Sequence, residues 1–147
     1  MASSESILEN LSRPREGRKY FTLREAKRAL GLVRRIATDI QETQAERVRL
    51  HGALTSDGRG KETPEARKMQ ERLDERTARL EELIRELEKI GVELKDPARG
   101  LLDFPAIHEG REILLCWKGG EATITHWHEI DGGFSGRRPV EELHDVL

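Results

Sequence analysis

The chain has 147 residues, of which 37% are charged and only 4% aromatic, so it has room for one modest core and much solvated surface. Its 26 basic and 28 acidic residues give a formal charge of −2, without the basic excess typical of nucleic-acid-binding surfaces. There is no apolar stretch of membrane-spanning length, no signal-peptide core, and Cys116 is the single cysteine. We therefore expect a cytoplasmic protein that contacts no membrane and has no internal disulfide.

Residues 1–19 are serine-rich and then basic, and no apolar period runs through them. This composition predicts a disordered basic arm. A basic arm can touch nucleic acid or an acidic partner, but the net-acidic chain disfavours nucleic acid as a partner.

Two helices are expected next, at 22–55 and 64–90, joined by a loop at 56–63. Thr22 and Glu25 form a capping box, Thr63 is an N-cap followed by proline, and Gly91 ends the second helix. Each helix carries a heptad seam. The facing seam positions are Leu30/Ile90, Val33/Leu87, Ala37/Leu83, Ile40/Leu80, Gln44/Arg76, Arg47/Leu73, His51/Met69 and Leu54/Ala66. Because one register satisfies every pair, the sequence predicts a long antiparallel helical hairpin.

The seam is apolar near its open end and polar farther out, where it contains Gln44, Arg47, His51 and Arg76. This polar cluster is either a loosely packed hairpin end or a polar layer that fixes register or partner number. The first helix has a second flank, formed by Ala29, Ile36, Thr43 and Leu50. Together with the sparse seam, this flank favours a homodimer that forms through the helices, for which a four-helix bundle is one arrangement.

The region 92–139 alternates with a period of two, which predicts an antiparallel β unit with a glycine-rich loop. Strands are expected at 101–107, 112–118 and 121–127, with a short one at 92–95, and Gly119-Gly120 suits a two-residue hairpin turn. Residues 140–147 are a C-terminal tail.

One strand register gathers the apolar residues on a single face. It pairs Leu102 with Trp117, Phe104 with Leu115, Ala106 with Ile113, and then Trp117 with Ala122, Leu115 with Ile124 and Ile113 with His126. This register places Trp117 in the core, Trp127 on the opposite face, and Asp103, Cys116 and Thr123 in a row on that opposite face.

Several segments between residues 20 and 140 are distinctive when they are taken together. They are Tyr20-Phe21-Thr22-Leu23, Glu25-Ala26, Val33-Arg34-Arg35, 91–97, 100–106, 110–117, Trp127-His128-Glu129 and 133–139. Taken together they resemble a bacterial family catalogued only as domain of unknown function 2203. The resemblance supports the element boundaries and implies no activity, so no catalytic residue follows from it.

The segment from His126 to Asp131 holds the best candidates for a site. His126 and His128 share one strand face, and with Glu129 or Asp131 they form a ligand set typical of zinc or non-haem iron. The alternative is that these histidines form the polar rim of the sheet. In the expected register Arg111 lies opposite His128, and its positive charge favours an anionic ligand over a bare divalent cation.

The loop 131–138 combines glycine amides with Arg137 and Arg138, which suits an anion. The alternative is a tight connection whose arginines pair with nearby acids. Cys116 lies beside Asp103 with no base next to it in this register, so it is not expected to act as a nucleophile.

The sequence thus predicts an α+β protein in which a coiled-coil-like hairpin packs at one end on a small sheet of three to four antiparallel strands. It favours an interaction module that dimerises through the hairpin. The alternative is a metal- or anion-binding module, with or without enzymatic activity, that uses Arg111, His126, His128, Glu129, Asp131, Arg137 and Arg138.

Overall fold

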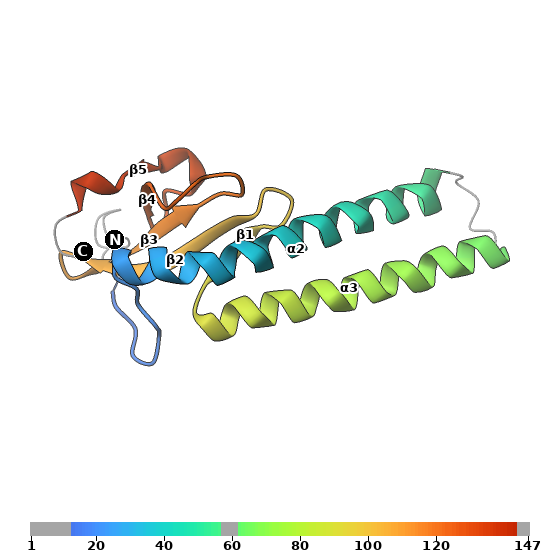
Figure 1. The fold of residues 1–147 in the computed structure, drawn as a ribbon, viewed down its shortest axis with the longest axis horizontal. Coiled ribbons are helices and arrows are strands. Elements are labelled where there is room, and N and C mark those ends of the chain that lie inside the picture. The colour runs from blue at the N-terminus through green and yellow to red at the C-terminus, as the bar shows by residue number, and fades with distance from the viewer. Residues whose placement is uncertain (1–12, 57–61, 144–147) are drawn as a thin grey trace, which may run out of the picture.

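The computed structural model describes residues 13–56 and 62–143, and their fold is α+β, as expected. Helices α2 (Leu23–Ser56) and α3 (Pro64–Ile90) form a long hairpin that extends from a five-stranded antiparallel sheet (Figure 1). The strands are β1 (Glu93–Asp96), β2 (Leu101–His108), β3 (Arg111–Trp117), β4 (His126–Glu129) and β5 (Arg138–Pro139), and the short 3-10 helices are η1 (Phe134–Gly136) and η2 (Val140–Glu142). The sheet therefore has one or two strands more than the sequence predicts.

Both helices begin and end at local capping signals. The backbone amide of Glu25 donates to Thr22 Oγ1 and that of Thr22 donates to Glu25 Oε1, both at 3.0 Å, which completes the capping box. Thr63 Oγ1 accepts from the Ala66 amide at 3.0 Å, and Gly91 closes α3 at φ 98°. These caps place the helix bounds within one residue of the expected 22–55 and 64–90. Residues 57–61 of the expected loop lie outside the described part of the chain.

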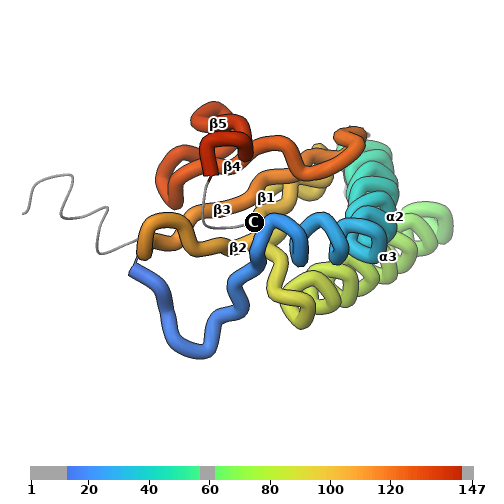
Figure 2. Tube along the Cα trace, turned by 60° about the vertical axis from the view of Figure 1, so that its left-hand side comes forward, coloured from blue at the N-terminus to red at the C-terminus, as the bar shows by residue number. Residues whose placement is uncertain are grey.

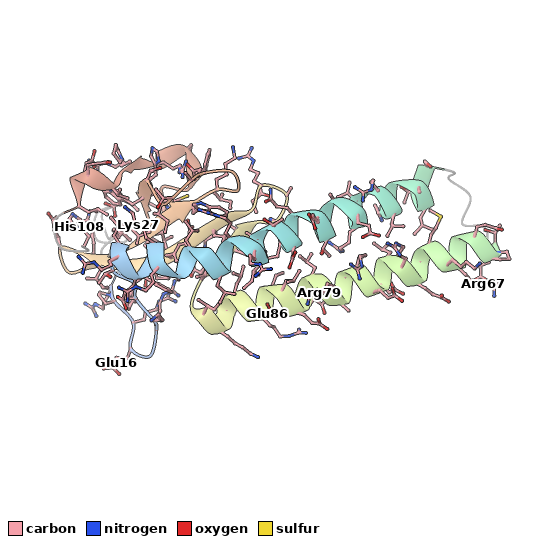
Figure 3. All side chains as sticks on the ribbon, viewed as in Figure 1. Glu16, Lys27, Arg67, Arg79, Glu86 and His108 are labelled. Carbon is pink, nitrogen blue, oxygen red and sulfur yellow. The ribbon has the colours of Figure 1, made fainter. Side chains whose placement is uncertain are left out.

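The hairpin seam is buried only near the sheet. Its buried residues there are Leu30, Val33, Ala37, Ile40, Leu80, Leu83 and Leu87. Farther out, Arg47 Nε donates to Thr77 Oγ1 at 3.0 Å and Arg72 pairs with Glu46, so polar contacts join the helices close to the expected register. His51, expected in the seam, is exposed. In Figure 3 Arg67 marks the outer end of the hairpin and His108 lies at the sheet end.

The central pairing of the sheet matches the expected register. The pairs Leu102↔Trp117, Phe104↔Leu115 and Ala106↔Ile113 join β2 to β3, and all of these side chains belong to the apolar core with α2 and α3. Strand order follows the chain from β1 to β5. The tube in Figure 2 shows the hairpin along one side of this sheet.

The expected pairing of the third strand is wrong. A turn forms at Gly119-Gly120, where the Glu121 amide donates to the Lys118 carbonyl at 3.0 Å, but it does not join two strands. The Gly119 amide bonds to the carbonyls of Arg99 and Gly100, each at 3.2 Å, and the chain reaches β4 only at His126. Ile124 is fully buried all the same, because it enters the core from the loop and not from a strand.

The observed register pairs Leu115 with Trp127, Cys116 with His126 and Leu114 with His128. Trp127 therefore shares the face of Leu115, where it is buried in the core, and does not lie on the opposite face as expected. The two histidines lie on the opposite face instead, and His128 does not lie opposite Arg111.

We predict that Trp117→Ala lowers the free energy of unfolding by about 3–5 kcal/mol, the usual cost of removing a buried aromatic ring. Trp117 is 2% exposed, and its indole also donates to the Glu121 carbonyl at 3.0 Å. Urea unfolding followed by circular dichroism measures the change. Leu32→Ala is the control: Leu32 is 60% exposed, and a loss above about 0.5 kcal/mol there would contradict this assignment of the core.

Candidate functional site

The face of the sheet opposite the helices carries a group of buried ionisable side chains. Asp103 on β2, Glu112 and Cys116 on β3, and His128 on β4 are 1%, 1%, 0% and 3% exposed. They share this face because residues two apart on a strand point the same way and directly paired residues lie side by side. Buried polar groups require partners, so their contacts decide what this face can do.

Asp103, Cys116 and His128 converge into one cluster. Their potential ligand atoms lie within 4.8 Å of one another, and His128 Nε2 is 3.0 Å from Asp103 Oδ1. His128 Nδ1 is 2.7 Å from the carbonyl oxygen of Glu129. Since a carbonyl only accepts, Nδ1 carries a hydrogen, and Nε2 is the ring atom that faces the cluster.

The neighbours of His128 favour the charged form of its ring. Burial by itself disfavours the charged ring, but the hydrogen bonds with Asp103 and Cys116 and the charge of Asp103 outweigh it and raise the pKa of His128 to about 10. The Nε2–H group then donates a hydrogen bond to the Asp103 carboxylate. The pair forms a buried ion pair beside the Cys116 side chain.

Arg137 contacts the same cluster from the loop before β5. Its Nη2 donates to the Cys116 carbonyl at 3.2 Å and to Glu121 Oε1 at 2.6 Å, and its guanidinium also interacts with the Cys116 side chain. Burial would lower the pKa of Arg137, but the Glu121 carboxylate outweighs it and raises the pKa. The His128 imidazole is also a neighbour of Cys116, which the expected register does not place there.

This arrangement does not match a nucleophilic cysteine site. A catalytic histidine needs one ring nitrogen on the thiol and the other on the group that orients it. Here Cys116 is fully buried, so a substrate has no access to its thiol, and His128 Nε2 already bonds to Asp103. The donor set of carboxylate, thiol and imidazole is instead one that can hold a metal ion.

The structure does not bring the expected metal set together. Glu129 faces away from His128 and pairs with Arg111, whose Nε is 3.1 Å from Glu129 Oε2. The pKa of Arg111 rises mainly because of this bond. His126 is half-buried with Nδ1 2.8 Å from Thr125 Oγ1, and Asp131 is exposed.

The glycine-rich loop has its own internal pairing. Arg137 binds Glu121, and Arg138 Nε is 2.8 Å from Glu142 Oε2. The guanidinium of Arg137 also stacks 4.7 Å from the centroid of the Phe134 ring. Both arginines therefore have carboxylate partners within the chain.

Part of the expected disordered arm makes specific contacts. Tyr20 donates its hydroxyl hydrogen to Glu112 Oε1 at 2.6 Å, Arg18 Nε lies 3.2 Å from the same oxygen, and Arg15 Nη2 lies 3.4 Å from Glu112 Oε2. Burial and the nearby Glu112 carboxylate raise the pKa of Tyr20. Residues 13–20, shown in blue beside β2 in Figure 2, are thus a strap over buried Glu112, and residues 1–12 lie outside the described chain.

A groove of about 550 Å³ lies between the outer parts of α2 and α3. Val48 on α2 and Leu73 on α3 line it, with Arg47 and Asp74 beside them. Val48 is 60% exposed. The expected polar cluster is only partly formed, because Arg47 bonds to Gln44 at 2.7 Å and to Thr77, whereas His51 points to solvent.

Comparison with known proteins identifies one family. A family model described as "Uncharacterized conserved protein (DUF2203)" matches residues 19–140. No curated protein and no solved structure matches the chain. Within the described residues, neither helix combines the length and apolar character that crossing a membrane requires.

We predict that the stability of the metal-free protein falls with rising pH between about 6.5 and 10. The folded state keeps a proton on His128 up to pH about 10, whereas the unfolded chain loses it near 6.5. The stabilisation that the protonated ring provides is complete below pH about 6.5. It is lost as the pH rises to about 10, and the free energy of unfolding falls by about 1.4 kcal/mol per pH unit between these values. Urea unfolding at a series of pH values, in chelator, measures it.

His128→Gln supplies the control, because its amide can still donate to Asp103 but does not titrate. The variant should lose this slope and keep the contribution of all other groups. Identical slopes in the two proteins would show that His128 is not protonated in the folded state.

Proposed function

This chain belongs to the uncharacterized conserved family DUF2203, and we propose that it is an interaction module that forms a homodimer through the outer part of its helical hairpin. The distal arm consists of residues 44–56 of α2 and 64–79 of α3. The observation that carries the proposal is its burial: no described residue of this arm is buried, whereas the hairpin nearer the sheet has a continuous apolar core.

The distal arm has little that holds it together by itself. Two short helices in water are marginal without an apolar face packed on a partner. Surface contacts such as Arg72–Glu46 add little, because exposed ion pairs are screened and lose side-chain entropy. Half-buried Leu50, Leu54, Met69 and Leu73 and exposed Val48 remain to be covered. A second hairpin laid against the arm covers them in the manner of a four-helix bundle.

Charge favours a second copy of this chain as the partner. Arg47 and Asp74 lie on the same groove with opposite signs, beside the apolar pair Val48 and Leu73. In a twofold dimer each surface meets its own copy, so Arg47 of one protomer can face Asp74 of the other, and the reverse. The pairing of opposite charges fixes register while the apolar side chains supply the buried area.

The second flank expected for dimerisation is only partly available. Ile36 is buried in the core, Ala29 packs against that core and Thr43 is buried, so Leu50 is the flank residue that lies in the distal arm. A change at Ile36 therefore tests folding and not association. Val48 is the better probe, because its side chain is exposed and lines the groove.

We predict that Val48→Glu weakens self-association more than about 100-fold and leaves each chain folded. Like charges brought together at a twofold contact cost several kcal/mol, and about 1.4 kcal/mol corresponds to tenfold in affinity. Sedimentation velocity over a concentration series measures the dissociation constant.

Leu32→Glu is the matched control, since Leu32 lies on the same helix and is also 60% exposed but outside the distal arm. It should leave the dimer intact. A wild-type chain that stays monomeric at the highest attainable concentration, or equal weakening by both substitutions, would refute the proposal.

A further inference from the structure

Three neighbouring strands place different donor types at one point on the far face of the sheet. Asp103 on β2 is directly opposite Cys116 on β3, and His128 on β4 lies diagonally across from Cys116. Diagonal neighbours on adjacent strands remain within reach of long side chains. The juxtaposition is therefore a consequence of the register, and it does not involve the helical hairpin.

The donor set selects a class of metal. Carboxylate oxygen, thiolate sulfur and imidazole nitrogen are the three ligand types that proteins use for zinc, whereas magnesium and calcium take oxygen ligands. In a tetrahedral site with bonds of about 2.0–2.3 Å the ligand atoms lie roughly 3.3–3.6 Å apart. The atoms here lie within 4.8 Å of one another, with Nε2 and Oδ1 at 3.0 Å, so small side-chain rotations suffice.

The histidine is oriented as metal-binding histidines are. Its Nδ1 donates to the Glu129 carbonyl, which fixes the ring and leaves Nε2 aimed at Asp103 and Cys116. A hydrogen bond from the non-binding ring nitrogen to a backbone carbonyl is a common support for a metal ligand. Such a bond stays intact when a metal replaces the proton on Nε2.

Charge also permits a divalent ion at this point. A divalent ion held by one carboxylate, one thiolate and one neutral imidazole gives a sum of zero, with the thiol proton released to solvent. The nearby guanidinium of Arg137 is already balanced by Glu121, and that of Arg111 by Glu129, so neither adds an uncompensated charge.

We propose that Asp103, Cys116 and His128 form a binding site for one zinc-class transition metal ion. The ion links β2, β3 and β4 at the centre of the sheet, and all three ligand side chains are buried. The site is independent of dimerisation through the distal arm. It differs from the set that the sequence suggests, because only His128 is common to both.

The test loads the full-length chain with a spectroscopic probe. Because the ligands are buried, purified protein is unfolded in chelator and refolded with Co²⁺, and Zn²⁺ is then added as a competitor. We expect one Co²⁺ per chain and a sulfur-to-cobalt charge-transfer absorption, which Zn²⁺ removes. The single cysteine makes the assignment direct, because Cys116 is the one sulfur that can form a thiolate.

Variants then separate this site from the alternatives. Cys116→Ser should abolish the charge-transfer band, and His128→Gln should weaken binding more than about 100-fold, since even a lost supporting contact behind a ligand costs about 10–100-fold. His126→Gln is the matched control on the same strand face and should bind as wild type. Circular dichroism of each variant confirms that it is folded.

The wild-type spectrum decides the question even if a variant fails to fold. A cobalt complex without a sulfur band, or no stoichiometric Co²⁺ or Zn²⁺ in the refolded chain, would overturn the proposal. So would loss of binding in His126→Gln together with unchanged binding in Cys116→Ser. Sedimentation of the same samples shows separately whether the dimer forms.

Discussion

The pairing of β2 with β3 is the constraint on which the rest of the molecule depends. Both faces of this pair are buried, and alternation along the strands gives them different contents. One face is apolar and packs on the hairpin, through residues such as Phe104 and Leu115. The other face holds Asp103, Glu112 and Cys116 away from water. A shift of one residue would bring these polar groups into the apolar core, which the sequence cannot stabilise.

How far sequence reasoning succeeds depends on how local each signal is. The helix ends follow from caps such as Thr22–Glu25 and from Gly91, whose partners lie within a few residues. The β2–β3 register follows from two long alternating segments that admit one solution. The start of β4 does not follow from the sequence pattern. The Gly119 amide bonds to the carbonyls of Arg99 and Gly100, and nothing near Gly119 in the sequence indicates those acceptors.

The candidate site is missed for the same reason. Asp103 and Cys116 are expected side by side, and that expectation depends on β2–β3 alone. His128 joins them through the β4 register, which the apolar pattern misplaces because Ile124 satisfies its burial from a loop. Burial of Ile124 is therefore read from the sequence as a strand position, although the residue lies in a loop. The distal hairpin shows the converse: His51 has the spacing of a seam residue but is exposed, because polar neighbours do not exclude water there.

The strap over Glu112 has a consequence for the order in which the chain can fold during synthesis. Glu112 contacts Arg15 and Tyr20, which precede it by 97 and 92 residues. The ribosome releases the strap first, so it must wait until β3 has emerged before its cations and hydroxyl find their acceptor. The hairpin, whose two helices are adjacent in the chain, can form well before that. The strap can therefore close only after β3 has emerged, which ties the beginning of the described chain to a sheet that is made late in synthesis.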